Sequence, residues 1–217
     1  GEMSDRMVEL GGTSILSETT EFIGAEHILA RRGKTKEISD RIYQIVHDYE
    51  HAIKLVGHDI REGNPSPGNK KGGISSLEDK SLGCTQKSGS APVMGVLSYG
   101  EPVKEKGLNL LSAPGNDLVA STALAASGAH IVLFTTGRGT PFASPVPTVK
   151  ISTNNQLAKK KQNWIDFNCG VMVNDTPLDE LSENLLDFVL EIASGKKSKS
   201  EEAGFHDMAI FKQGVTL

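Results

Sequence analysis

The sequence predicts an α/β fold with a mostly parallel, Rossmann-like sheet flanked by helices, preceded by a helical N-terminal lobe. From residue 93 onward, short apolar runs alternate with helical patterns, which is typical of βαβ units. Residues 130–136 form a β-branched and aromatic run, as expected of an interior parallel strand. Over residues 36–57, apolar side chains instead recur at helical spacing. We therefore expect a helical lobe over 1–63 and an α/β region over 64–217, with functional residues on its loops.

Each expected element has a local signal. Gly33 and Gly128 are placed to stop helices, Asn116 or Asp117 can begin one, and Thr176-Pro177 opens the last long one. The predicted helices span residues 5–10, 21–32, 36–57, 75–87, 117–127 and 178–195. The predicted strands span residues 14–17, 93–97, 108–112, 130–136, 148–152 and 170–173. Residues 196–217 are predicted to be a polar tail.

Composition narrows the class of protein. The chain has 217 residues and a net charge of −4, which argues against nucleic acid as the main partner. Its apolar runs are too short to cross a membrane, and residues 1–6 lack the features of a signal peptide. Cys84 and Cys169 are therefore expected to be free thiols in a reducing cytoplasm. Because the chain opens in a helical pattern, we expect it to be part of a longer protein.

Residues 64–73 are rich in proline and glycine, and a helix with charged side chains follows. Such backbones suit a loop whose N–H groups approach an anion closely. Asn64, Asn69 and Lys70 lie in this loop and are candidates to bind substrate hydroxyls or a carboxylate. Glu78 and Lys80 are candidates for acid–base catalysis, together with Lys70. Helix positions two apart do not face each other, so a plain surface role for Glu78 stays open.

Two further loops follow predicted strands, where parallel sheets commonly bind ligands. Thr136, Gly137 and Arg138 combine a hydroxyl, a flexible backbone and a guanidinium, which suits a carboxylate or phosphate clamp. The alternative is a solvent-exposed turn. Asp117 lies where a helix N-terminus could bind an anion, although it could equally cap that helix. Neither loop matches a dinucleotide or P-loop fingerprint.

Glu18 and His27 are candidates for a metal site. Carboxylates with one imidazole can hold a divalent ion, and Glu21 lies between the two in sequence. A plain helix surface is the alternative interpretation of this segment.

Five stretches of the chain together resemble one family. They are residues 16–27 (LSETTEFIGAEH), 64–73 (NPSPGNKKGG), 77–83 (LEDKSLG), 113–117 (APGND) and 134–139 (FTTGRG). In this order they resemble the C-terminal portion of the altronate and galactarate dehydratases, which are sugar-acid dehydratases. The resemblance covers about residues 8 to 207.

The resemblance implies a hydro-lyase that removes water from an aldonate or aldarate to give a 2-keto-3-deoxy acid. It implies a divalent metal, with Fe²⁺ the first candidate, that stabilises an enolate. Proteins of the family have a longer chain with an N-terminal region, and we expect that region to be a partner of the present chain. Whether the present chain is active alone stays open. A homo-oligomer is also expected. The alternatives are a lyase subunit like that of sulfolactate sulfo-lyase, which releases sulfite, and a non-catalytic sugar-acid-binding module. We expect Lys70 and Arg138 to meet in one cationic cleft.

Overall fold

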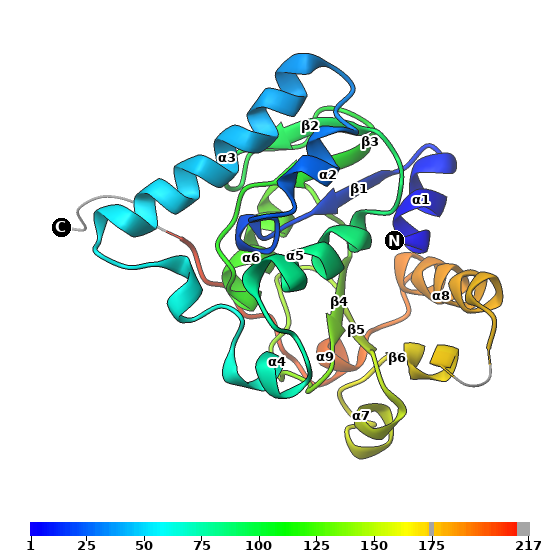
Figure 1. Ribbon diagram of the computed structural model, residues 1–217. Helices are drawn as coiled ribbons and strands as arrows, with labels where there is room; N and C mark the ends of the chain where they lie inside the picture. Colours follow the sequence, from blue (N-terminus) through cyan, green and yellow to red (C-terminus); the bar gives the residue numbers. More distant parts are fainter. Residues whose placement is uncertain (174–175, 212–217) are drawn as a thin grey trace. The chain divides into compact units, whose positions relative to one another are not determined.

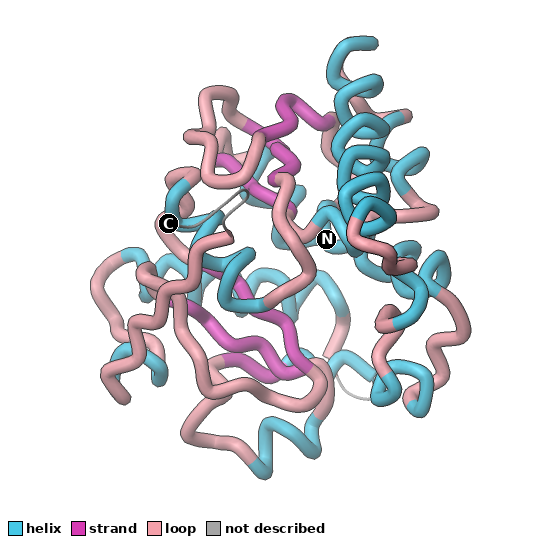
Figure 2. Tube along the Cα trace, turned by 90° about the vertical axis from the view of Figure 1, so that its left-hand side faces the viewer, coloured by secondary structure: helices cyan, strands magenta, loops and turns pink. Residues whose placement is uncertain are grey.

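The computed structural model describes residues 1–173 and 176–211, which belong to two compact units divided between Asn116 and Asp117. Each unit contains one three-stranded parallel sheet flanked by helices (Figures 1 and 2). The predicted α/β class, the parallel strands and the helical N-terminal segment are therefore confirmed. The strands form two sheets instead of one, and the predicted boundary at 63/64 lies inside the first unit.

The first unit is built on the strand order β1-β3-β2. Its strands are β1 (Thr13–Leu16), β2 (Val93–Leu97) and β3 (Gly107–Leu111), with Thr13 opposite Gly107 and Leu97 opposite Leu111. Its helices are α1 (Glu2–Glu9), η1 (Thr19–Glu21), α2 (Glu26–Ala30), α3 (Lys36–Leu55), η2 (Ile60–Glu62), α4 (Pro67–Lys71), α5 (Leu77–Thr85) and η3 (Gln86–Ser88). In the structure α3 packs against β2 and α2, which is why the helical N-terminal segment and the first sheet form one unit.

One apolar core holds the first unit together. Phe22, Leu29, Ile42 and Leu108 are each fully buried and belong to a single cluster that joins α2, α3 and the sheet. Burying a side chain of this size contributes about 1.5–3 kcal/mol. Thr35 caps α3, because its hydroxyl accepts a hydrogen bond from a backbone N–H of the first turn.

The second unit repeats the plan with the strand order β4-β5-β6. Its strands are β4 (Val132–Thr136), β5 (Thr148–Ser152) and β6 (Phe167–Asn168). Its helices are α6 (Asp117–Ala126), α7 (Asn155–Lys160), η4 (Cys169–Val173), α8 (Leu178–Ala193) and α9 (Lys199–Glu202). The long helix α8 buries one apolar stripe, which contains Leu181, Leu185, Val189 and Ile192.

Three local predictions were wrong. Residues 170–173 form the 3-10 helix η4 instead of a strand, and the strand lies just before it. The predicted helix 21–32 is interrupted at Gly24, whose φ of +86° is left-handed, so α2 begins only at Glu26. The predicted tail contains α9, which Ser198 and Glu201 start with a capping box.

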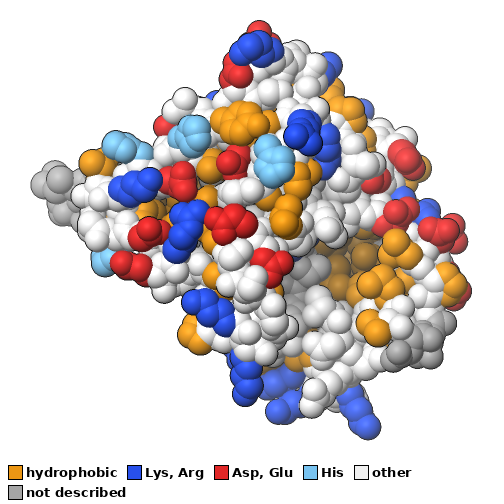
Figure 3. All heavy atoms as spheres, viewed as in Figure 1, with side chains coloured by type: hydrophobic (Ala, Val, Ile, Leu, Met, Phe, Trp, Pro, Cys, Tyr) orange, Lys and Arg blue, Asp and Glu red, His pale blue; other side chains and the backbone are white. Residues whose placement is uncertain are grey.

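The surface carries both signs of charge. Acidic and basic side chains are interspersed across the face drawn in Figure 3, in agreement with the small net charge of −4. Within residues 1–173 and 176–211, no helix combines the length and the apolar character that a membrane span needs.

Candidate functional site

The carboxyl ends of β1 and β3 meet in two interlocked loops of the first unit. The backbone N–H of Thr19 donates to the Ala113 carbonyl at 2.9 Å, and the Ala113 N–H donates to the Thr19 hydroxyl at 3.2 Å. Gly115 lies so close to Thr20 that a Cβ there would approach Oγ1 to 2.3 Å. Glu18 has a φ of 74°, a conformation that costs a non-glycine residue energy and is often found at functional sites. This edge of the sheet is therefore closely packed and locally strained.

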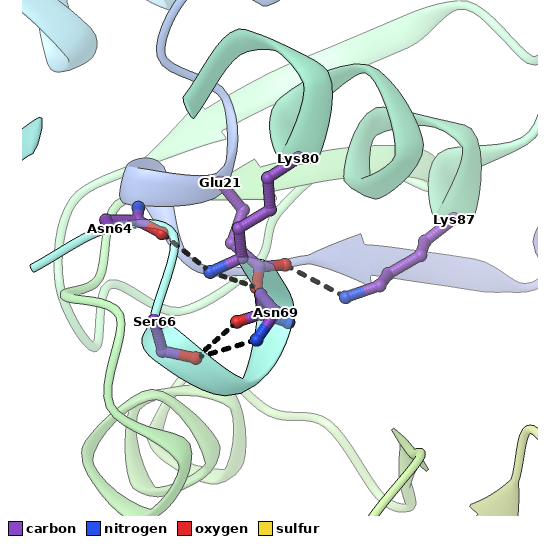
Figure 4. A network of polar contacts seen from close by, with 6 residues as sticks. All are labelled: Glu21, Asn64, Ser66, Asn69, Lys80 and Lys87. Atoms are coloured by element: carbon purple, nitrogen blue, oxygen red, sulfur yellow. Dashed lines mark hydrogen bonds and ion pairs between the residues drawn. The ribbon is translucent and has the colours of Figure 1, made fainter. Parts of the chain in front are cut away.

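Glu21, at the end of η1, is the centre of a polar cluster (Figure 4). Its carboxylate lies 2.9 Å from the Lys87 ammonium and 3.7 Å from the Lys80 ammonium. The side chains of Glu21 and Lys80 are only 14% and 21% exposed, whereas Lys87 is 42% exposed. Two cations thus share one largely buried carboxylate.

The geometry of α5 explains why both lysines reach this carboxylate. Lys80, Cys84 and Lys87 are spaced four and three residues apart, so they lie on one face of α5 and its continuation η3. The helix begins at Ser76, whose hydroxyl accepts a hydrogen bond from the Asp79 N–H. Because α5 packs against η1, this face brings its two ammonium groups to Glu21.

The cluster shifts the acidity of its members. Burial raises the pKa of Glu21, but the ammonium groups of Lys87 and Lys80 outweigh it, so the net pKa lies below the ordinary value. Burial lowers the pKa of Lys87, yet Glu21 more than compensates and the pKa rises. Burial and the Glu21 charge raise the pKa of the Cys84 thiol to about 12. At neutral pH Glu21 is therefore ionised, Lys87 is protonated and the Cys84 thiol is neutral.

The loop over residues 64–73 contributes amides to the same cluster. The Asn64 side-chain oxygen accepts a hydrogen bond of 3.0 Å from the Lys80 ammonium (Figure 4). Part of the loop is helical, because Ser66 caps α4 and its hydroxyl donates to the Asn69 side-chain oxygen at 2.6 Å. Lys70 lies in the last turn of α4 and is exposed. The structure thus brings Asn64 onto Lys80 and leaves Lys70 facing solvent.

Glu78 and Lys80 have different partners, as their spacing of two residues implies. The Glu78 carboxylate accepts a 2.6 Å hydrogen bond from Arg61, and both side chains are about half exposed. This hydrogen bond lowers the pKa of Glu78, which makes the carboxylate a weaker base. Lys80, by contrast, contacts both Asn64 and Glu21.

The predicted anion clamp lies in the second unit, at the end of β4. The Thr136 hydroxyl accepts hydrogen bonds from the N–H groups of Gly139 at 2.9 Å and Arg138 at 3.4 Å. Asn154, the N-cap residue of α7, donates to the Gly137 carbonyl at 3.1 Å. The Thr136 hydroxyl therefore shapes its own turn, while Arg138 is exposed. Asp117 is the first residue of α6. That the Arg138 loop meets Lys70 of the first unit stays a prediction.

The predicted metal pair does not form a recognisable centre in the part of the chain that the structure describes. His27 is exposed on α2, and Glu18 precedes η1. Among the described residues, no group of three histidine, cysteine or acidic side chains could hold a metal ion. These residues alone do not supply a full ligand set for Fe²⁺.

Comparison with known proteins identifies the family. The model of the family described as D-galactarate/altronate dehydratase, C-terminal, matches residues 1–216. The chain belongs to this family. It is 51% identical to altronate dehydratase from Bacillus subtilis (strain 168), over 100% of this chain and 44% of that protein. It is 37% identical to galactarate dehydratase (L-threo-forming) from Escherichia coli (strain K12), over 97% of this chain and 41% of that protein.

A more distant relative belongs to a different lyase. The chain is 30% identical to the beta subunit of (2R)-sulfolactate sulfo-lyase from Chromohalobacter salexigens, over 97% of this chain and 55% of that subunit. The chain thus spans about half the length of the curated relatives it matches. The expected membership of the altronate and galactarate dehydratase family is confirmed.

Sequence reasoning missed the centre of the cluster. It considered Glu21 only as a neighbour of the Glu18 and His27 pair, and it did not include Lys87 or Ser66. A usable signal was present for Lys87, since residues 80 and 87 are two helical turns apart in a predicted helix. No comparable signal connects Glu21 to this helix, because the contact joins segments about 60 residues apart and depends on the tertiary fold.

Proposed function

We propose that this chain is the C-terminal region of a sugar-acid dehydratase, with altronate as the first substrate to test. The family match over residues 1–216 carries the proposal, and the higher identity to altronate dehydratase decides the order of testing. The polar cluster of Glu21, Lys80, Lys87 and Asn64 supports it, because a polyhydroxylated anion needs cations and amides together. The reaction removes a proton from C2 and hydroxide from C3. Water leaves, and the enol product tautomerises to a 2-keto-3-deoxy acid.

Lys80 is our candidate for the residue that assists this elimination. An ammonium has three N–H donors, and the Lys80 ammonium donates a hydrogen bond to Asn64 and forms an ion pair of 3.7 Å with Glu21. We propose that a remaining N–H donor binds an oxygen of the substrate. There it can stabilise the negative charge of an enolate or protonate the departing hydroxyl. Lys87 and Glu21 hold Lys80 in place through the shared carboxylate. The base that takes the C2 proton is left unassigned.

The Arg138 loop supports the proposal as a second anion site. An exposed guanidinium on a turn fixed by Thr136 and Asn154 is suited to a bidentate contact with a carboxylate. We propose that Thr136, Gly137 and Arg138 bind a carboxylate of the substrate. Asn69, Lys70 and Asp117 stay candidates for further substrate contacts.

Dependence on a divalent metal, Fe²⁺ first, is also part of the proposal. Glu18 and His27 provide at most two ligands, so other ligands would come from elsewhere in the enzyme, and we assign no step to the metal. We further propose a homo-oligomeric cytoplasmic enzyme, in which an N-terminal region accompanies this chain. The free thiols Cys84 and Cys169 agree with a reducing compartment.

The test uses the whole enzyme with and without Fe²⁺. Altronate, galactarate and sulfolactate are supplied separately, and the formation of 2-keto acid and sulfite is measured. Keto-acid formation from a sugar acid supports the dehydratase. Sulfite release from sulfolactate alone would favour the sulfo-lyase alternative. Saturable binding of a sugar acid without any product would favour a binding module and contradict the proposal.

A further inference from the structure

A lysine is buried in the middle of the second sheet. Lys150 is the central residue of β5 and is only 2% exposed. Among the residues that the structure describes, its ammonium makes no hydrogen bond or salt bridge, and its nearest specific interaction is with the Phe142 ring at 5.5 Å. A buried charge without a partner costs several kcal/mol. A bound anion that pairs with this ammonium would offset that cost.

Two carboxylates lie near this lysine without contacting its ammonium. Asp166 accepts backbone N–H bonds from Lys150 and Lys199, both at 2.8 Å, and Asp207 accepts one from Ala143 at 3.4 Å. Burial lowers the pKa of Lys150, while Asp166 and Asp207 act in the opposite direction. Because the backbone holds both carboxylates, they favour the charged form of the lysine from a distance and leave its N–H donors unused.

Lys150 also lines a small cavity of the second unit. It has a volume of about 180 Å³, and Lys150 lines it together with Trp164 and Phe205. The polar groups at its wall include Ser200 and Lys199, whose ammonium donates to two backbone carbonyls at 2.5 Å. Pockets for drug-sized ligands usually measure about 300–1,000 Å³. The cavity therefore suits an anion of a few heavy atoms with a small apolar part.

We propose that this cavity binds a small monocarboxylate, of the size of acetate or pyruvate, with its carboxylate on the Lys150 ammonium. The rings of Trp164 and Phe205 then contact the apolar end of the ligand. The residues that line the cavity belong to the second unit, and the Glu21 cluster belongs to the first. The proposal therefore does not depend on the dehydratase function.

Isothermal titration of the whole protein with acetate and with pyruvate, at constant ionic strength, tests the proposal. We expect saturable binding that the Lys150→Met variant weakens at least about tenfold, since a charged hydrogen bond is lost. Lys159→Met, which changes an exposed lysine on α7, is the matched control and is expected to bind as the wild type. Chloride at the same concentration is expected not to compete.

A second variant separates loss of binding from loss of folding. Ala203 lines the cavity and is exposed directly after α9, so Ala203→Phe fills the space while Lys150 stays in place. We expect this variant to melt like the wild type and to bind at least about tenfold more weakly. Absence of saturable binding by the wild type would overturn the proposal. So would equal competition by chloride, or wild-type affinity in Ala203→Phe.

Discussion

The Glu21 carboxylate links two lysines, so its removal tests how much the cluster stabilises the first unit. The perturbation is Glu21→Gln, which keeps the shape of the side chain and removes its charge. An exposed ion pair contributes about 0–1 kcal/mol, and breaking a fully buried one costs about 3–5 kcal/mol. Glu21 is 14% exposed, but Lys87 is 42% exposed and therefore screened by solvent. We expect a loss of about 2 kcal/mol at pH 7, which corresponds to a melting temperature about 4–8 °C lower.

The pH dependence makes this prediction sharper. The pKa of Glu21 is lowered in the folded chain, so its contribution is complete at pH values well above 4.5, the ordinary pKa of a glutamate. The contribution is lost as the pH falls through the folded pKa, and the difference between wild type and Glu21→Gln should shrink there. Urea unfolding at pH 7 and pH 4 measures this difference.

A matched control removes a carboxylate of a different kind. Glu62 pairs with His58 at 3.5 Å, and their side chains are 66% and 70% exposed. We expect Glu62→Gln to change the free energy of unfolding by less than about 0.5 kcal/mol. Equal stability of Glu21→Gln and the wild type at pH 7 would refute the reasoning. A destabilisation that stays the same at pH 4 would also refute it.

Three further predictions concern single residues. At pH 8 we expect iodoacetamide to alkylate Cys84 at least about 100-fold faster in the urea-unfolded chain than in the folded chain. The reason is that the Cys84 pKa of about 12 keeps the thiol neutral in the folded chain. Equal alkylation rates, measured by peptide mass spectrometry, would contradict this. Gly115→Ala should destabilise the folded chain by about 1–3 kcal/mol, because the added Cβ clashes with Thr20. Gly83→Ala has open space in α5 and should stabilise the chain by up to about 1 kcal/mol. The opposite order of stability in calorimetry would contradict both predictions. Arg138→Ala should raise KM several-fold at unchanged stability, and an unchanged KM would remove it from the site.

Periodicity was enough to predict most elements of the fold. The apolar spacing of 36–57 predicted α3 to within two residues, and the run at 130–136 contains all of β4. The sequence patterns gave a wrong prediction where tertiary contacts determine the structure of a short segment. Residues 170–173 are apolar enough for a strand, but Gly170 packs directly against the backbone of Asn154 and Asn155, and the chain turns there into η4.

The site was harder to predict than the fold. Asn64 and Lys80 were both candidates, and the structure joins them by a hydrogen bond. Glu78 was given equal weight with Lys80, although its ion pair with Arg61 could not be seen from the sequence. The centre of the cluster, Glu21, was missed for the same reason. Contacts between segments far apart in the chain follow from packing, and no local pattern encodes them.

The turnover of paired variants tests the central claim most directly. In the whole enzyme, Lys80→Met should lower kcat for the sugar acid by about 100-fold or more, because it removes a positioned donor. Glu78→Gln changes the same helix and should keep kcat within about threefold, since Glu78 faces Arg61 and solvent. Full turnover by a folded Lys80→Met variant, or loss of turnover in Glu78→Gln alone, would contradict the account.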